Sequence, residues 1–470
     1  MNAVDLVFTA ALEQARLIRE RTVSPLELTT LYLERIERLN PLLGSYFTVM
    51  AEQAIADAKH KTEFLATPPS ELPPFFGVPI SIKDLNPLAG VPCSYGVSAA
   101  RQRIAEKDDG VIAPIRRAGF IILGKTATSQ LGSFPYTEPP GFPPTRNPWS
   151  LAHTPGGSSG GAASALAAGL CAIAQGSDGG GSIRGPAFCC GLVGLKPSRG
   201  RISFAPVGER LNGMATNGPL GRTVADTAAL LDVMSGYVIG DPYWLPPPPV
   251  SFLAATQTDP LPLKIGMFTA LQPVGEAHAD CRQAVLKTAQ RLEALGHSVE
   301  PVVPPDLTEL IEPFTIAWQC VVAEANIPFF VLEKMNRWLL WQAGFVGSGA
   351  YLQAMTQLQV VSRRIVQQFY HYDILLLPVY QRPAIRVGVW QSLRCKNILE
   401  NIIDWIAPCP PFNASGQPAI AIPTGLTDDG LPVGVQLVGR PAADATVLAL
   451  AAQLERAYPW HSVRPRLVLS

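Results

Sequence analysis

Two serines in glycine-rich stretches have neighbours suited to nucleophilic chemistry. Ser182 directly follows three glycines in "SDGGGSIRG", and Ser158 lies in "PGGSSGG". Glycine is costly in an ordinary helix or strand, so such a run predicts that another group approaches the backbone where no Cβ fits. Bare glycine amides can donate hydrogen bonds to the oxyanion that forms when a serine attacks a carbonyl. A phosphate-binding loop and a plain turn are the alternatives.

Phosphate-binding and esterase motifs fit these stretches less well. Neither "GLVGLKPS" nor "GGGSIRGP" supplies G-x-x-x-x-G-K-[ST], and the glycines around Ser182 do not follow G-x-G-x-x-G. Gly156 to Gly160 does match the G-x-S-x-G elbow of esterases, with histidines later in the chain. That elbow requires a strand before the serine, and the preceding "PPTRNPWSLAHTP" is too rich in proline for a central strand.

A buried lysine is the candidate base for these serines. A serine hydroxyl is a weak nucleophile until a base takes its proton, and no histidine lies near either stretch in a motif-like setting. Burial can lower the pKa of a lysine from about 10.4 toward roughly 7–8. Lys83 follows a short apolar strand predicted over 78–82, whereas Lys125 and Lys196 are predicted to lie in turns with structural roles.

Long ordered motifs along the chain carry a resemblance to one enzyme family. They run from "GVPISIKD" and "GKTATSQLG" through "TRNPWSLAHTPGGSSGGAASALAAG" and "GSDGGGSIRGPAFCCGLVGLKPSRGR" to "FNASGQPAIAIPTGLTDDGLPVGVQLVGRP". The sequence resembles the amidase signature family over nearly its whole length. The resemblance implies a Ser–cisSer–Lys triad that cleaves carboxylic amides through a serine acyl-enzyme.

The resemblance also implies roles for individual residues. Ser182 falls at the nucleophile, Ser158 at the bridging serine that follows a cis peptide bond, and Lys83 at the general base. Gly179, Gly180 and Gly181, with the Ser182 amide, fall at the oxyanion donors; Asp178 and Arg184 fall at positions that hold this loop; Gly132 and Ser158 fall where the family lines its substrate site.

Three positions depart from the commonest family pattern. Gly179 stands where many relatives carry Thr or Ile, Gly185 stands where glutamine-dependent transamidases carry Gln, and Ala127 replaces a frequent Asn. The last two argue against a transamidase. We therefore expect an amidase for apolar aryl or alkyl amides, with ester or carbamate hydrolysis as a side activity. The alternatives are the amidase subunit of a glutamine-dependent amidotransferase and a catalytically inactive module that binds a small molecule.

Selectivity is predicted to come from the middle of the chain, about residues 310 to 355. This stretch is poor in charge and rich in aromatic residues, which could line a pocket or pack in the core. They are Phe314, Trp318, Phe329, Phe330, Trp338, Trp341, Phe345 and Tyr351.

Composition excludes several classes of function. Lys+Arg and Asp+Glu balance at 37 each, which disfavours nucleic acid and anionic membrane surfaces as partners. No apolar run approaches the 18 or so residues of a membrane span, and the amphipathic N-terminus does not match a signal peptide. The eight cysteines include no C-x-x-C and no paired Cys/His spacing. We expect a cytoplasmic enzyme with no metal and no cofactor, which acts on a small-molecule amide; a homodimer is left open.

The element pattern predicts one large α/β domain over residues 1–470. A strand–helix alternation from residue 78 to 175 favours a mixed, mostly parallel twisted sheet covered by helices on both faces. Within it we expect a catalytic core over about 70–225, a variable substrate-pocket segment over about 245–385, and C-terminal strands and a helix over 405–470. A capping box at Ser24 and Glu27 opens an early helix, predicted to end at Asn40-Pro41.

Overall fold

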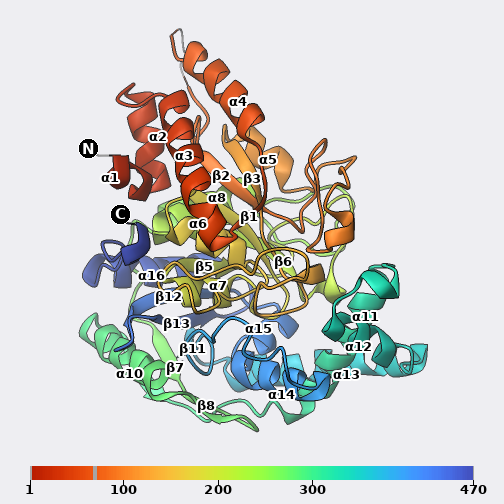
Figure 1. Ribbon diagram of the computed structural model, residues 1–470. Coiled ribbons are helices and arrows are strands. Elements are labelled where there is room, and N and C mark those ends of the chain that lie inside the picture. The colour runs from red at the N-terminus through yellow and green to blue at the C-terminus, as the bar shows by residue number, and fades with distance from the viewer. Residues whose placement is uncertain (1–2, 67–70, 469–470) are drawn as a thin grey trace.

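A single mixed sheet of eleven strands runs through the molecule, in the computed structural model that describes residues 3–66 and 71–468 (Figure 1). Its order is β1-β3-β2-β4-β6-β5-β12-β13-β11-β7-β10, and β8 and β9 form a separate ribbon. The strands are β1 (Tyr46–Val49), β2 (Pro79–Lys83), β3 (Ile121–Thr126), β4 (Ile173–Asp178), β5 (Val193–Lys196), β6 (Thr216–Gly221), β7 (Lys264–Met267), β8 (Ala270–Leu271), β9 (Gly275–Glu276), β10 (Ser298–Pro301), β11 (Ile374–Pro378), β12 (Ala419–Leu426) and β13 (Pro432–Gly439).

The predicted predominance of parallel pairing is wrong. Among the described strands, four neighbouring pairs are parallel, namely β2 with β3 and with β4, and β7 with β10 and with β11. The other six pairs of the large sheet are antiparallel. The βαβ pattern of residues 78–175 does not extend to the centre, where β12 and β13 form a hairpin. A hairpin needs only a short turn, whereas parallel neighbours need a crossover.

Helices cover both faces of this sheet, as predicted (Figure 1). On β13, Gln436 accepts a hydrogen bond from Arg184 of α7, whereas Gly439 approaches Val447 of α16 on the opposite face. The helices are α1 (Ala3–Phe8), α2 (Ala11–Arg19), α3 (Pro25–Leu43), α4 (Ala51–Phe64), α5 (Ile112–Arg117), α6 (Gly160–Ala167), α7 (Arg184–Cys190), α8 (Val224–Met234), α9 (Phe252–Ala255), α10 (Ala279–Ala294), α11 (Thr308–Glu324), α12 (Lys334–Ala343), α13 (Ser348–Gln368), α14 (Cys395–Ile406), α15 (Pro410–Ala414) and α16 (Asp444–Ala457).

Helix α3 begins as predicted and ends later than predicted. The Ser24 hydroxyl accepts from the Glu27 amide at 3.1 Å, and the Ser24 amide donates to the Glu27 carboxylate at 2.8 Å. The helix continues through Pro41 to Leu43 and ends where Gly44 adopts a left-handed conformation, φ 60°, with its amide bound to the Asn40 carbonyl. Proline removes only one donor here, so the left-handed glycine marks the end instead.

The strands near the candidate site extend further toward their carboxyl ends than predicted. Lys83 is the last residue of β2, Lys125 lies within β3, and Lys196 ends β5. The prediction that Lys125 and Lys196 lie in turns is therefore wrong. Gly124 suggested a turn, but a Cβ there would lie 2.2 Å from the Thr48 oxygen of β1, so this glycine permits close approach of two strands.

The middle segment forms a helical lobe beside the sheet. Helices α11, α12 and α13 lie together at one side of the molecule, and α14 packs against α12 (Figure 1). None of the described helices is both long and apolar enough to span a membrane. All eight cysteines are free thiols, and six of them are buried.

Candidate active site

Three segments bring Lys83, Ser158 and Ser182 to one edge of the sheet. Lys83 ends β2, Ser158 lies in the loop before α6, and Ser182 lies between β4 and α7. Strands β2 and β4 are parallel neighbours, and ligands in such sheets bind outside the carboxyl ends of the strands. The Gly157–Ser158 peptide bond is cis, as the resemblance implied.

The amine of Lys83 contacts two hydroxyl groups. Its Nζ donates to Ser158 Oγ at 2.8 Å and to Ser177 Oγ at 3.0 Å, with the Ser177 carbonyl oxygen at 3.3 Å. The structure thus brings Lys83 and Ser158 together as predicted. Ser177 was missed by the sequence analysis, although it stands in the same glycine-rich stretch. Its position five residues before Ser182, at the end of β4, was the available signal.

Burial governs the acidity of the Lys83 amine. Lys83 is fully buried, and this lowers its pKa to about 7, although the nearby charge of Asp178 acts in the opposite direction. Lys196 is also fully buried, with a pKa lowered to about 7, mainly by burial. Its Nζ donates to the Pro197 carbonyl and contacts no serine hydroxyl among the described residues. Geometry, and not acidity alone, therefore distinguishes Lys83.

The carboxylate of Asp178 holds the glycine loop. It accepts from the backbone amides of Gly181 at 2.7 Å and Ile183 at 3.1 Å, and from the guanidinium of Arg184 at 3.0 Å. Burial alone would raise the pKa of Asp178, but Arg184 outweighs it and holds that pKa well below its usual range. Arg184 in turn donates to Asn413, Gln436 and the Cys409 carbonyl. This network ties the loop to the C-terminal third of the chain.

The backbone amides of the loop divide into two kinds. In the described part of the chain, the amides of Gly179, Gly180 and Ser182 make no hydrogen bond. The amide of Gly181 instead donates to Asp178. The oxyanion-donor role implied for Gly181 is therefore corrected, because its N–H already has a charged acceptor. Gly181 adopts φ +119°, which a residue with a side chain rarely takes, so its contribution is to shape the loop.

Ser182 lies in the walls of two cavities. Its side chain is 8% exposed, and its hydroxyl makes no hydrogen bond to another described residue. One cavity, here called the apolar cavity, has a volume of about 90 Å³. The other, here called the polar cavity, has a volume of about 370 Å³ and is also lined by Ser158 and Ser177. A group bound against Ser182 therefore has access to both.

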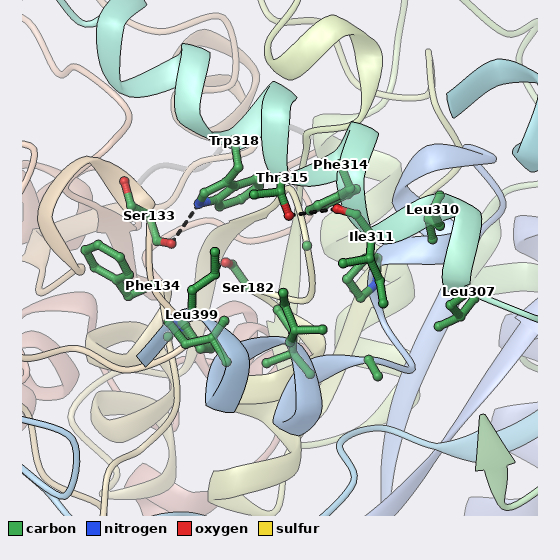
Figure 2. A pocket seen from close by; sticks show the side chains of 18 of the residues that line it. Ser133, Phe134, Ser182, Leu307, Leu310, Ile311, Phe314, Thr315, Trp318 and Leu399 are labelled. Atoms are coloured by element: carbon green, nitrogen blue, oxygen red, sulfur yellow. Dashed lines mark hydrogen bonds between the residues drawn. The ribbon is translucent and has the colours of Figure 1, made fainter. Parts of the chain in front are cut away.

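Helices α11 and α14 form the apolar cavity on either side of Ser182. Figure 2 shows Phe314 and Trp318 of α11 facing this space, with Leu399 of α14 across from them. Trp318 is held by its Nε1, which donates to the Ser133 carbonyl at 2.9 Å. The other aliphatic and aromatic lining residues include Phe134, Leu307, Leu310, Ile311, Met335, Leu339, Ile402, Ile403 and Ile406.

Most aromatics of the middle segment take no part in this cavity. Of the eight predicted candidates, Phe314 and Trp318 line it, and Trp338 and Tyr351 pack against the core. Four others are exposed by half or more, namely Phe329, Phe330, Trp341 and Phe345. Helix α14, which supplies the opposite wall, lies beyond the predicted pocket segment of about 245–385. Its aliphatic stripe of Leu399, Ile402 and Ile406 was the overlooked signal.

Gly132 lies in the wall of the polar cavity beside Ser158. Its φ is +71°, and a Cβ there would lie 2.7 Å from Leu85 Cδ1 and 3.4 Å from Ser158 Oγ. The absence of a side chain at this position keeps the approach to Ser158 open. In the part of the chain that the structure describes, no cluster of three or more His, Cys, Asp or Glu residues could hold a metal ion.

Comparison with known proteins shows the family of this chain. The family model described as "Amidase" matches residues 27–448. A putative amidase of Synechocystis sp. is 52% identical over 454 residues, covering 96% of this chain and 89% of that protein. The 6-aminohexanoate-cyclic-dimer hydrolase of Paenarthrobacter ureafaciens is 33% identical over 497 residues, covering 100% of this chain and 98% of that protein.

Solved structures extend the similarity to the whole fold. A structure of 6-aminohexanoate cyclic dimer hydrolase matches with a TM-score of 0.91 and 32% identity, covering 98% of this chain and 99% of that one. That enzyme has also been solved complexed with substrate. A bacterial aryl acylamidase matches with a TM-score of 0.88 and 25% identity, covering 97% of each chain. Fold and sequence together define an amidase, a hydrolase that acts on carbon–nitrogen bonds. The chain belongs to the amidase signature family.

Replacement of Arg184 by methionine should destabilise the protein strongly. Removing one partner of a buried ion pair leaves the other charge uncompensated and typically costs about 3–5 kcal/mol. Arg184 and Asp178 are both fully buried. Arg364→Met is the matched control, because its ion pair with Glu309 is more than half exposed on both sides and should contribute little to stability. Urea unfolding, monitored by tryptophan fluorescence, measures the free energy of unfolding of both variants. An equal decrease in this free energy for the two variants would contradict the loop-holding role of Arg184.

Proposed function

We propose that this amidase cleaves apolar carboxylic amides through an acyl-enzyme on Ser182, with Lys83 as the base and Ser158 as the proton relay. The observation that carries the proposal is the 2.8 Å contact between the buried Lys83 amine and Ser158, in the wall of a cavity that also contains Ser182. A hydroxyl between nucleophile and base takes the place of the imidazole in a serine triad.

The chemistry balances in two half-reactions. Neutral Lys83 takes the proton of Ser158 as Ser158 takes that of Ser182, whose oxygen bonds the substrate carbonyl carbon. The amides of Gly179, Gly180 and Ser182 stabilise the resulting oxyanion. The C–N bond then breaks, and the leaving amine receives the proton from Lys83 through Ser158. The acyl group remains bound to Ser182 as an ester. Water then attacks this ester by the same relay, and the carboxylic acid is released.

The apolar cavity supports a substrate with a hydrocarbon group. Burial of apolar surface contributes about 25 cal/mol per Å² removed from water. Phe314, Trp318 and Leu399 offer such surface, and none of the described residues that line this cavity carries a charge. The names of two structural relatives, an aryl acylamidase and a 6-aminohexanoate cyclic dimer hydrolase, agree with an amide of this kind. Esters and aryl carbamates should react as side activities, because they pass through the same oxyanion.

The packing around Gly185 favours a self-sufficient amidase over a component of a glutamine-dependent transamidase. A Cβ at Gly185 would lie 1.8 Å from the hydroxyl of Tyr380, a fully buried residue. A glutamine side chain at position 185 therefore has no space unless Tyr380 moves. The second alternative, an inactive binding module, is disfavoured by the Lys83–Ser158 contact, which such a module would not need.

Substitution of the three proposed catalytic residues should abolish or greatly reduce turnover. Ser182→Ala should lose acylation altogether, and Ser158→Ala or Lys83→Ala should reduce kcat by about 10³-fold or more, because nucleophile, relay and base act as a unit. Amide turnover and labelling by a fluorophosphonate probe measure these losses. Each of the six histidines, substituted singly, should leave most activity. Near-normal activity of Lys83→Ala would reject the triad, and an inactive histidine variant would revive the esterase elbow.

Activity should rise with pH and reach a plateau in the alkaline range. Lys83 accepts a proton only when neutral, and its pKa is lowered to about 7, so kcat/KM is expected to fall as the pH drops below about 7. The pH profile of kcat/KM for an anilide measures the midpoint. Lys196→Gln removes the other buried lysine of similar pKa and should leave the midpoint in place. An optimum near pH 5 would point to a carboxylate base.

The isolated chain should prefer amides that fill the apolar cavity. We expect p-nitroanilides and alkyl amides to exceed glutamine in kcat/KM, with an aryl carbamate and an ester as slower substrates. Leu399→Asp, which places a charge in the cavity wall, should reduce kcat/KM for the apolar amides most. A preference for glutamine, or activity that needs an added partner chain, would reject this assignment.

A further inference from the structure

Ser182 lies in the wall of two cavities whose lining residues differ in polarity. Ser158 and Ser177 line the polar cavity only, whereas Phe314 and Leu399 line the apolar cavity only. Trp318 stands in the wall of both. An amide bound against Ser182 therefore presents its acyl group and its amine to two different sets of side chains.

The proton relay decides which group enters which cavity. The leaving amine must take a proton from Ser158, and a proton donor has to lie within hydrogen-bond reach of the atom it serves. Ser158 lines the polar cavity and not the apolar one. The amine therefore belongs in the polar cavity, which leaves the apolar cavity to the acyl group.

The side-chain amide of Asn217 is fully buried in the wall of the polar cavity, and its nitrogen lacks a hydrogen-bond partner among the described residues. Gln175 Oε1 accepts from the Lys83 backbone amide at 3.1 Å, so the Gln175 nitrogen faces Asn86 Oδ1 at 3.0 Å and Asn217 Oδ1 at 3.1 Å. Asn86 Nδ2 also donates to Asn217 Oδ1, at 2.9 Å. These bonds orient the Asn217 amide, and its Nδ2 has no partner among the described residues. A buried donor without a partner is costly, and an acceptor on a ligand in this cavity would satisfy it.

Two arginines line the polar cavity, and one of them has no ion-pair partner among the described residues. Arg103 is exposed and makes no ion pair or hydrogen bond through its side chain to another described residue. Arg210 lies 3.6 Å from Glu324, and both are exposed at the mouth. Asp109 is the other acid in the described lining; its carboxylate accepts from the Val111 amide, and burial raises its pKa to about 6. Arg103 is thus the cation of the described lining that forms no ion pair.

We propose that the polar cavity binds a carboxylate carried by the leaving amine, with Asn217 and Arg103 as its donors. This inference rests on the proposed function and narrows it to N-acyl amino acids and N-acyl aminobenzoates. The acyl chain occupies the apolar cavity, and hydrolysis releases a fatty or aryl acid and the free amino acid. Arg210, paired with Glu324, lies at the mouth through which that amino acid leaves.

A matched pair of substrates tests the proposal on the full chain. In 4-(hexanoylamino)benzoate the amine carries a carboxylate, and in 4-(hexanoylamino)benzamide it carries a neutral group of the same shape. We expect the benzoate to have a kcat/KM at least about tenfold higher, as a charge-assisted hydrogen bond provides. Intrinsic reactivity favours the benzamide, because the carboxamide withdraws electrons more strongly. A carboxylate on the acyl side, in adipic acid monoanilide, should lower kcat/KM relative to hexanoyl anilide.

Variants of the residues that line the polar cavity show which side chains cause the preference for the benzoate. Arg103→Gln should reduce the benzoate-to-benzamide ratio severalfold, and added salt should reduce it in the wild type. Arg101→Gln is the matched control, since Arg101 binds the Gly141 carbonyl outside the cavity and should leave the ratio unchanged. Asn217→Leu should also lower the ratio; if that variant does not fold, Arg103→Gln decides.

The outcomes separate this inference from the proposed function. Equal kcat/KM for benzoate and benzamide, or a preference for adipic acid monoanilide over hexanoyl anilide, would overturn the carboxylate site. The amidase mechanism would still stand in that case if hexanoyl anilide were hydrolysed in a Ser182-dependent way. No hydrolysis of any of the four amides would overturn both. If the benzoate-to-benzamide ratio of kcat/KM stayed unchanged in Arg103→Gln, and also in a folded Asn217→Leu variant, the assignment of these two donors would be overturned.

Discussion

The Lys83 amine must stay out of water, and much of the surrounding structure is arranged to keep it there. Burial lowers its pKa to about 7, and contact with solvent would return the amine to its charged form. Asp178 lies close enough to favour that charge. The ion pair of Asp178 with Arg184 is therefore important, because it commits the carboxylate to another cation. The pKa of Lys83 thus depends on a balance between its burial and the charge of Asp178.

The same ion pair shapes the backbone that faces the substrate. Asp178 binds the amide of Gly181, which turns the loop so that the amides of Gly179, Gly180 and Ser182 remain without partners among the described residues. Unpaired amides near a reactive serine are costly in the resting protein and useful when an oxyanion forms. The loop geometry and the pKa of Lys83, the proposed base, therefore depend on one buried cluster, and a change at Arg184 should affect both.

Two cavities meet at Ser182 because the sheet edge and the helical lobe meet there. The polar cavity is lined by residues near strands β2, β4 and β6 and by the C-terminal part of α11, whereas the apolar cavity is closed by α11 and α14. Helix α11 contributes to both cavities, whereas Ser158 and Ser177 line the polar cavity alone. The lobe can vary in sequence without disturbing the contacts of Lys83, since none of its described residues bonds to the Lys83 amine.

The sequence by itself determined the family, the α/β class and the residues of the proposed triad, because these are encoded in contiguous motifs around Lys83, Ser158 and Ser182. Local signals such as the capping box at Ser24 were equally readable. Only the tertiary structure decided features that depend on distant segments meeting: the antiparallel centre of the sheet, the wall from Leu399, and the commitment of the Gly181 amide to Asp178. The unpaired donor of Asn217 belongs to the same group. A motif records which residues are present, but hydrogen-bond partners and cavity walls are set by packing across the chain, which no single stretch contains.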